Sequence, residues 1–357
     1  MTEPRFCYVL MCHTRGDAVA RNARRIRELS PTSDVMLRYD VPGLMDERAC
    51  AEMGVQTYED DITVRWGDWT MVEAQLRALR EARRRSDASH FVLLSGQDYP
   101  IRDLASWESG VAADGSDAVL DLHGDSPETY TWTWRHLPGP EILRRVTGPL
   151  AWRAAHRLPG QLQAVRSPTS HHWYVGVPRR AAAPVPVVKA AVWATLSARA
   201  VDRLLAVTDQ RPELPRFFRT TRTPDELYTS SVLSAQADLQ VRTGRTTYAD
   251  FPEGASNPEW VDAALLARAA DTPAAFVRKM HPDVDPDVLR LADELVDARP
   301  SPSHGCFALR LAGDRATRRG PSRRRRRAPV RARRAAPRGR SPGRHARCGT
   351  TGAGRRT

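Results

Sequence analysis

Lysine is nearly absent from this sequence of 357 residues: only Lys189 and Lys279 occur, against 53 arginines. A skew of this kind is typical of a GC-rich genome, in which lysine persists mainly where the planar arginine fork cannot replace its compact ammonium. Both lysines fall in segments that carry other candidate functional residues. We therefore treat them as candidates for chemistry that needs a point charge.

Motifs of several common protein classes are missing as well. The sequence has no G-x-S-x-G elbow and no cysteine in a recognisable catalytic segment, which argues against serine and cysteine nucleophiles. Neither G-x-G-x-x-G nor a Walker loop occurs, which argues against dehydrogenases and P-loop enzymes. The five cysteines form no C-x-x-C pair, and no early apolar run is long enough for a signal peptide or a membrane span. The simplest expectation is a reduced, cytoplasmic setting.

Positive charge is concentrated at the C-terminus. From Asp314 to Thr357 there are 17 arginines, no lysine and one acidic residue, so this segment carries +16 and the remainder carries −3 of the total +13. A basic nucleic-acid surface on the body is therefore not expected. Composition predicts a disordered Arg-rich tail at 313–357 behind a folded domain at 1–312. The tail has two open interpretations, a polybasic arm for peripheral contact with anionic lipid or nucleic acid, or a shifted reading frame.

Alternating strand and helix patterns predict an α/β fold. Phe6–Met11 is an apolar run typical of a buried strand, an Arg-rich helix follows to about Leu29, and Val35–Tyr39 predicts the next strand. Strand, helix, strand is the opening of a doubly wound sheet. Further strands are predicted at Phe91–Gly96, Ala118–Leu122 and Arg245–Phe251, and a closing helix over Val284–Ala298.

Two helix starts and one irregular segment are also predicted. Thr70 with Glu73, and Thr223 with Glu226, have the spacing of a capping box, in which the two side chains satisfy free backbone N–H groups at a helix N-terminus. Residues 130–188 are rich in Trp, Pro and His without a clean period, which predicts a long insertion without regular structure. Loops of this length are usually functional.

Five segments carry the residues with chemical potential. They are VRWGDW (64–69), FVLLSGQDYP (91–100), KAAVWATLS (189–197), TPDEL (223–227) and FVRKM (276–280). In this order and at these separations they resemble the Core-2/I-branching glycosyltransferases and the related peptide O-xylosyltransferases. The resemblance implies a single domain of the glycosyltransferase A type, a nucleotide-binding twisted mixed sheet flanked by helices, in a bacterial version of the catalytic domain alone.

The same resemblance implies a reaction and two central residues. The reaction is inverting transfer of a sugar from a UDP donor to a glycan or peptide hydroxyl, with N-acetylglucosamine in β-1,6 linkage as first choice and xylose on a serine as second. Glu226, in the P-D-E segment, is the expected base, with the helix cap as its alternative role. Lys279, with Arg278 beside it, is expected to face the donor diphosphate in place of a metal ion, with solvated surface cations as the alternative.

Further contacts follow from the resemblance. Asp98 in SGQDYP, Trp66 and His13 are expected on the donor side, with an Asx turn as the alternative role of Asp98. Tyr248, Trp193 and the insertion at 130–188 are expected near the acceptor. The Gly-Ser that precedes the aromatic residue in the family is Ala190-Ala191 here, so core packing is an equal alternative for Trp193.

A metal site and two other functions stay open at this point. Asp121, His123 and Asp125 alternate, so a strand would project them to one face, and carboxylate with imidazole suits Mn²⁺ or Zn²⁺. Without this site the expectation is no cofactor, the UDP-sugar being a substrate. The rival functions are a sugar-binding protein that has lost catalysis, and a nucleic-acid binder driven by the tail.

Overall fold

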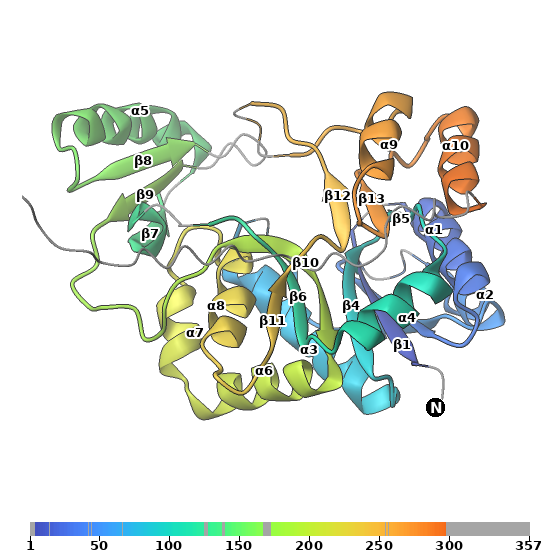
Figure 1. The fold of residues 1–357 in the computed structure, drawn as a ribbon. Helices are drawn as coiled ribbons and strands as arrows, with labels where there is room; N and C mark the ends of the chain where they lie inside the picture. Colours follow the sequence, from blue (N-terminus) through green and yellow to red (C-terminus); the bar gives the residue numbers. More distant parts are fainter. Residues whose placement is uncertain are drawn as a thin grey trace, which may run out of the picture. The chain divides into compact units, whose positions relative to one another are not determined.

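A seven-stranded mixed sheet forms the centre of the fold in the computed structural model (Figure 1). The structure describes residues 4–297 except 14, 42, 44, 66, 125–127, 138–139, 167–172, 254 and 256. Trp66, Asp125 and the predicted tail therefore lie outside the described residues. In spatial order the strands are β11 (Val241–Thr243), β6 (Ala118–Leu122), β10 (Ala190–Ser197), β4 (His90–Ser95), β1 (Phe6–Cys12), β2 (Asp34–Tyr39) and β3 (Gln56–Glu59).

Strand direction decides which residues meet at one edge of this sheet. β3, β2, β1 and β4 run parallel, as do β11 and β6, whereas β10 is antiparallel to both β4 and β6. The start of β10 therefore lies at the same edge as the carboxyl ends of β1, β4 and β6. The register confirms this, because Ala190 pairs with Leu122 and the Lys189 carbonyl accepts from the His123 N–H.

Helices cover both faces of the sheet. Along β1, Cys7, Val9 and Met11 face one apolar cluster, and Phe6, Tyr8 and Leu10 face the other. Alternation with both faces buried is what strands of a doubly wound sheet require. The first face is covered by α3 (Trp69–Arg85), α6 (Ala198–Gln210), α7 (Glu213–Phe218) and α8 (Tyr228–Ser234), and the second by α1 (Gly16–Leu29), α2 (Glu47–Glu52) and α4 (Leu104–Asp114). The predicted α/β class is confirmed.

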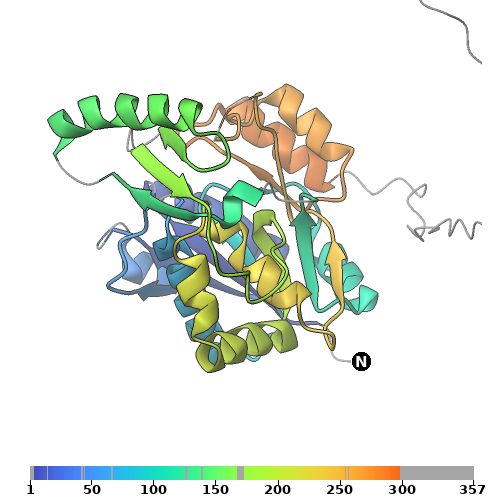
Figure 2. The same ribbon diagram turned by 90° about the vertical axis from the view of Figure 1, so that its left-hand side faces the viewer.

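Two small sheets lie at one edge of the large sheet, the upper edge in Figure 1. Figure 2 gives the view at right angles. One contains β12 (Thr247–Ala249), β13 (Phe276–Arg278) and β5 (Tyr99–Pro100), and the helices α9 (Ala263–Ala270) and α10 (Pro286–Asp297) pack in the same apolar cluster. The other contains β7 (Thr133–His136), β9 (Trp173–Val177) and β8 (Gln163–Arg166), with α5 (Glu141–Arg157) against it.

The prediction that the insertion lacks regular structure was wrong, because this second small sheet and α5 lie within it. Its strands are four or five residues long, which is too short for a period to be legible in the sequence. Gly148 of α5 fits closely against the Trp173 ring, where a Cβ would lie 2.2 Å from Nε1. The predicted strand at Arg245–Phe251 is also shorter, since only Thr247–Ala249 pairs.

Neither predicted capping box forms. α3 begins two residues earlier than that box requires, at Trp69, because the Asp68 carboxylate accepts the Thr70 N–H at 3.0 Å. Thr223 cannot act as a cap, since its backbone is left-handed with φ of 44° whereas an N-cap needs an extended conformation. A short 3₁₀ turn, η2 (Pro224–Glu226), follows it before α8 begins at Tyr228.

The described residues belong to one compact unit, Met1–Ser301. The predicted domain boundary near residue 312 lies outside them. Within the described part of the chain, no helix combines the length and the apolar character needed to cross a bilayer.

Candidate active site

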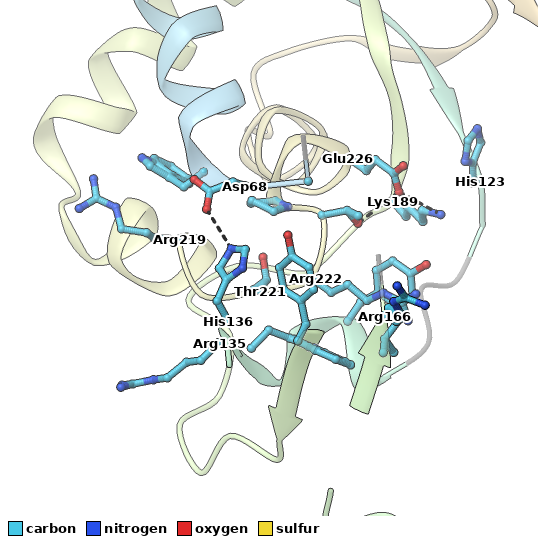
Figure 3. Close-up of a pocket in the computed structure, with 18 of the residues that line it drawn as sticks. Asp68, His123, Arg135, His136, Arg166, Lys189, Arg219, Thr221, Arg222 and Glu226 are labelled. Carbon is cyan, nitrogen blue, oxygen red and sulfur yellow. Dashed lines mark hydrogen bonds and ion pairs between the residues drawn. The ribbon is translucent and has the colours of Figure 1, made fainter. Parts of the chain in front are cut away.

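Glu226 lines a cavity of about 530 Å³ (Figure 3). The wall is built from the start of α3, the insertion, Lys189 at the start of β10, and residues of the 219–226 segment. Small-molecule sites are typically clefts of about 300–1,000 Å³, so a cavity of this size can hold one or two sugar rings. The predicted base is therefore at a place that a ligand can enter.

The Glu226 carboxylate is held by two neighbours. Lys189 Nζ lies 3.1 Å from Oε2, and the Thr223 hydroxyl donates to the same oxygen at 3.3 Å. Both charged side chains are only partly exposed, Lys189 at 22% and Glu226 at 28%. Burial lowers the pKa of Lys189, but the interactions with Glu226 and Tyr130 outweigh it, so the pKa is raised overall. The lysine is thus charged and orients the carboxylate.

Two residues near Glu226 have unfavourable features, Thr223 in its backbone and Asp225 in its buried carboxyl group. Thr223 is β-branched, and positive φ in such a residue is uncommon outside functional or tightly constrained sites. Asp225 carries a carboxyl oxygen, Oδ1, that is buried and has no hydrogen-bond partner among the described residues. Burial, with the neighbouring Glu226 charge, raises the pKa of Asp225 to about 7.

A second cluster forms around Arg278 at the end of β13. Its Nε lies 3.5 Å from Asp98 Oδ1, and its guanidinium stands 4.6 Å from the centre of the Trp193 ring. Asp98 Oδ2 accepts from the Ser95 N–H and from the Thr247 hydroxyl. Asp98 is completely buried, so in this structure it presents no surface to donor hydroxyls and instead positions Arg278.

Lys279 and His13 adjoin this cluster. Lys279 Nζ lies 5.0 Å from the Trp260 ring centre and has no acidic partner among the described residues. Burial and the neighbouring Arg278 charge lower its pKa. Partial burial also lowers the pKa of His13; Asp40 opposes this, while Lys279 and Arg278 add to it. The site thus has an ammonium whose counter-charge would come from a ligand.

Both clusters lie along one edge of the large sheet. His13 follows β1 and Asp98 follows β4. β1 is the topological switch point of the sheet, because the chain continues to β2 on one side of β1 and later to β4 on the other. Ligands of open α/β sheets bind outside the carboxyl ends of the strands at such a point. Lys189 directly precedes β10 and Trp193 lies four residues further on. They span less than the roughly 13 Å of a regular strand, because the register of β10 is irregular between Ala190 and Ala194. The donor-type and base-type clusters are therefore neighbours, although Lys279 does not line the cavity of Glu226.

The aromatic residues expected at the acceptor do not line this cavity. Trp193 supports Arg278, and Tyr248 lies 5.8 Å from the Arg245 guanidinium, so both belong to the neighbouring cluster. The cavity is lined instead by aromatic residues of the insertion, namely Tyr130, Trp134 and Tyr174. Sequence reasoning missed these three because the insertion has no period, but the unusual density of Trp and Tyr was a usable signal.

The alternative metal ligands are only partly described. Asp121 lies 3.6 Å from His123, but its carboxylate is 3.1 Å from the Arg245 guanidinium, and Asp125 lies outside the described residues. Among the described residues no group of three or more His, Cys, Asp or Glu side chains is arranged to hold a metal ion.

The sequence model described as Core-2/I-Branching enzyme matches residues 43–280, well over half of the chain. The chain belongs to this family. Its members are glycosyltransferases, so the protein is a transferase with a nucleotide-sugar donor and a glycan acceptor. The predicted family and enzyme class are confirmed, and the fold is a mixed sheet flanked by helices, as predicted. No curated protein matches the chain.

Three solved structures that are similar to the chain have low sequence identity to it. A putative glucose-1-phosphate thymidylyltransferase from Bacillus anthracis, in complex with a sucrose, is 8% identical with a TM-score of 0.32, covering 67% of this chain and 86% of that one. A nucleotidyl transferase from Methanothermobacter thermautotroptrophicus is 10% identical with a TM-score of 0.24, covering 56% and 75%. Rv0371c from Mycobacterium tuberculosis H37Rv is 13% identical with a TM-score of 0.22, covering 35% and 69%.

Proposed function

We propose that this glycosyltransferase transfers a sugar from a UDP donor to a glycan hydroxyl with inversion, and without a metal ion. Glu226 removes the proton of the attacking hydroxyl, and Lys279 with Arg278 neutralises the departing diphosphate. N-acetylglucosamine in β-1,6 linkage is the first choice for the transferred sugar. Xylose delivered to a serine is the second, because both belong to the resemblance from which the proposal starts.

One observation carries the assignment of the base: the Glu226 carboxylate stands in a cavity and has no helix-capping role. Its oxygen contacts are Lys189 and Thr223, so the carboxylate is fixed in place. A general base must lie within hydrogen-bonding reach of the proton that it removes, and typically contributes 10²–10⁴-fold to the rate. The capping alternative loses its support because Thr223 is left-handed.

Two observations support the diphosphate role of Lys279. It lies beside His13, at the sheet edge where nucleotides bind in open α/β folds, and it lacks an acidic partner among the described residues. An ammonium about 4 Å from a phosphate oxygen contributes roughly 4 kcal/mol at an effective dielectric constant of 20. This is enough to take over one contact of a metal ion, and Arg278, held by Asp98, adds a second positive charge.

A panel of UDP-sugars tests the proposal. UDP release would be measured with UDP-N-acetylglucosamine, UDP-xylose, UDP-glucose and UDP-galactose, with and without oligosaccharide acceptors, and the product linkage and anomeric configuration by NMR. We expect one donor to be preferred and the product to be inverted. A retained anomeric configuration would contradict the role of Glu226. Donor binding without UDP release from any of them would favour a sugar-binding protein that has lost catalysis.

A further inference from the structure

Basic side chains predominate in the wall of the Glu226 cavity. Among the described residues two carboxylates line it, Asp68 and Glu226, against five residues with a fixed positive charge: Arg135, Arg166, Lys189, Arg219 and Arg222. The cavity thus has a formal excess of +3, although the chain before Asp314 carries −3 in total. The excess is a property of this site and not of the general composition.

The arginines of the cavity have no acidic partner in the part of the chain that the structure describes. Among the described residues none of the four forms an ion pair, whereas arginines elsewhere do so readily, for example Arg80 with Asp209 and Arg83 with Asp202. Arg222 instead stands over two aromatic rings, 5.1 Å from Tyr130 and 5.5 Å from Trp134. Arg222 is partly buried, so an anionic ligand would offset the desolvation of its guanidinium. Arg135, Arg166 and Arg219 are exposed, and for them an anionic ligand would only supply the missing counter-charge.

Arg222 and Lys189 both contact the Tyr130 ring, at 5.1 Å and 5.0 Å from its centre. Figure 3 draws Arg166 toward the same side of the cavity as these two, with Arg135 and Arg219 toward the other. Lys189 already pairs with Glu226, so Arg222 and Arg166 are the cations left for a ligand on that side. The aromatic faces of Tyr130 and Trp134 offer a surface for a sugar ring.

We infer that the acceptor is a glycan that carries a carboxylate, such as a hexuronate residue, next to the hydroxyl that is glycosylated. The carboxylate pairs with Arg222 and Arg166, and its ring lies against the insertion aromatics. This inference rests on the proposed function, in which the same cavity holds the acceptor hydroxyl. The donor diphosphate is the other candidate anion, but it has its own cations, Lys279 and Arg278, at the neighbouring cluster.

Binding of two short probes to the full-length protein tests this. Trigalacturonate carries carboxylates, and galactotriose is its neutral counterpart. We expect calorimetry to give at least about tenfold tighter binding of trigalacturonate, the effect of one charged hydrogen bond, with the preference shrinking as salt is added. Equal affinity for the two probes would overturn the inference.

Variants identify where the anion binds. Arg222→Gln with Arg166→Gln should lose at least about tenfold in trigalacturonate affinity, and the Lys versions should keep most of it. Arg48→Gln, on the exposed surface of α2, is the matched control and should bind as the parent does. Unchanged binding in the double Gln variant would assign the anion to the Arg-rich tail and refute the inference. Thermal unfolding checks that each variant is folded.

Donor kinetics separate this inference from the proposed function. The double Gln variant should keep the KM for the UDP-sugar within about threefold, because the diphosphate lies elsewhere. An equal loss of donor and trigalacturonate binding would mean that Arg222 and Arg166 hold the diphosphate, and the inference would be wrong. Glu226→Gln should still prefer trigalacturonate. Failure of the proposed function would appear differently, as absence of UDP release from the parent protein.

Discussion

Replacing Glu226 by Gln tests the centre of the mechanism, because it removes a base while preserving shape. The Gln side chain can still accept a hydrogen bond from the Thr223 hydroxyl, as Glu226 Oε2 does at 3.3 Å. It cannot take a proton from an acceptor hydroxyl. We therefore expect turnover with saturating donor and acceptor to fall by about 10²-fold or more, the usual contribution of a general base.

The structure also gives an estimate of how much Glu226→Gln lowers the free energy of unfolding. Lys189 and Glu226 are 3.1 Å apart, which corresponds to about 5 kcal/mol of attraction at an effective dielectric constant of 20. Most of this is offset by the desolvation of two partly buried charges, so the net loss should be about 1–2 kcal/mol. A protein with 5–15 kcal/mol of stability remains folded after such a loss. Slow turnover could then not be attributed to unfolding.

The assay pairs UDP release with guanidinium unfolding. Lys189→Met, alone and combined with Glu226→Gln, completes a double-mutant cycle that isolates the ion pair. Glu213→Gln is the matched control, since Glu213 pairs with Arg211 at 2.7 Å on an exposed surface and should change neither quantity noticeably. Near-normal turnover of Glu226→Gln would refute the assignment of the base. A stability loss well beyond 2 kcal/mol would refute the reading of the ion pair.

Three other perturbations follow from the two clusters. Lys279→Met should reduce kcat on the order of 10³-fold, the equivalent of roughly 4 kcal/mol, and a loss under threefold in steady-state kinetics would remove its role. Incubation with EDTA should leave UDP release unchanged; a loss that Mn²⁺ restores would instead implicate Asp121 and His123. Asp225, whose pKa is raised to about 7, binds a proton in the folded state that it has lost in the unfolded state. Stability should therefore fall as pH rises from about 4 to 7, and Asp225→Asn should flatten this fall in pH-dependent unfolding. An unchanged pH profile in that variant would contradict the pKa shift.

Local sequence patterns predicted the core of the fold well. The apolar runs at β1, β2, β4 and β6 were legible because both faces of these strands are buried. The helix starts were less reliable: Thr70 with Glu73 has capping-box spacing, but Asp68, two residues earlier, caps α3 instead. Cap residues compete over one or two positions, and a pattern alone does not decide between them.

The sequence by itself determined the family, the α/β class and the segments with chemical potential, because these depend on residue identity and on periodicity within a few turns or strands. Only the tertiary structure decided which of these segments meet. Glu226 could not be paired with Lys189 from sequence, and Asp98 could not be recognised as a buried support for Arg278. The physical reason is that β10 runs antiparallel between β4 and β6, which brings its start to the edge where the parallel strands end. Contacts between residues far apart in the chain depend on that strand order, which no local pattern encodes.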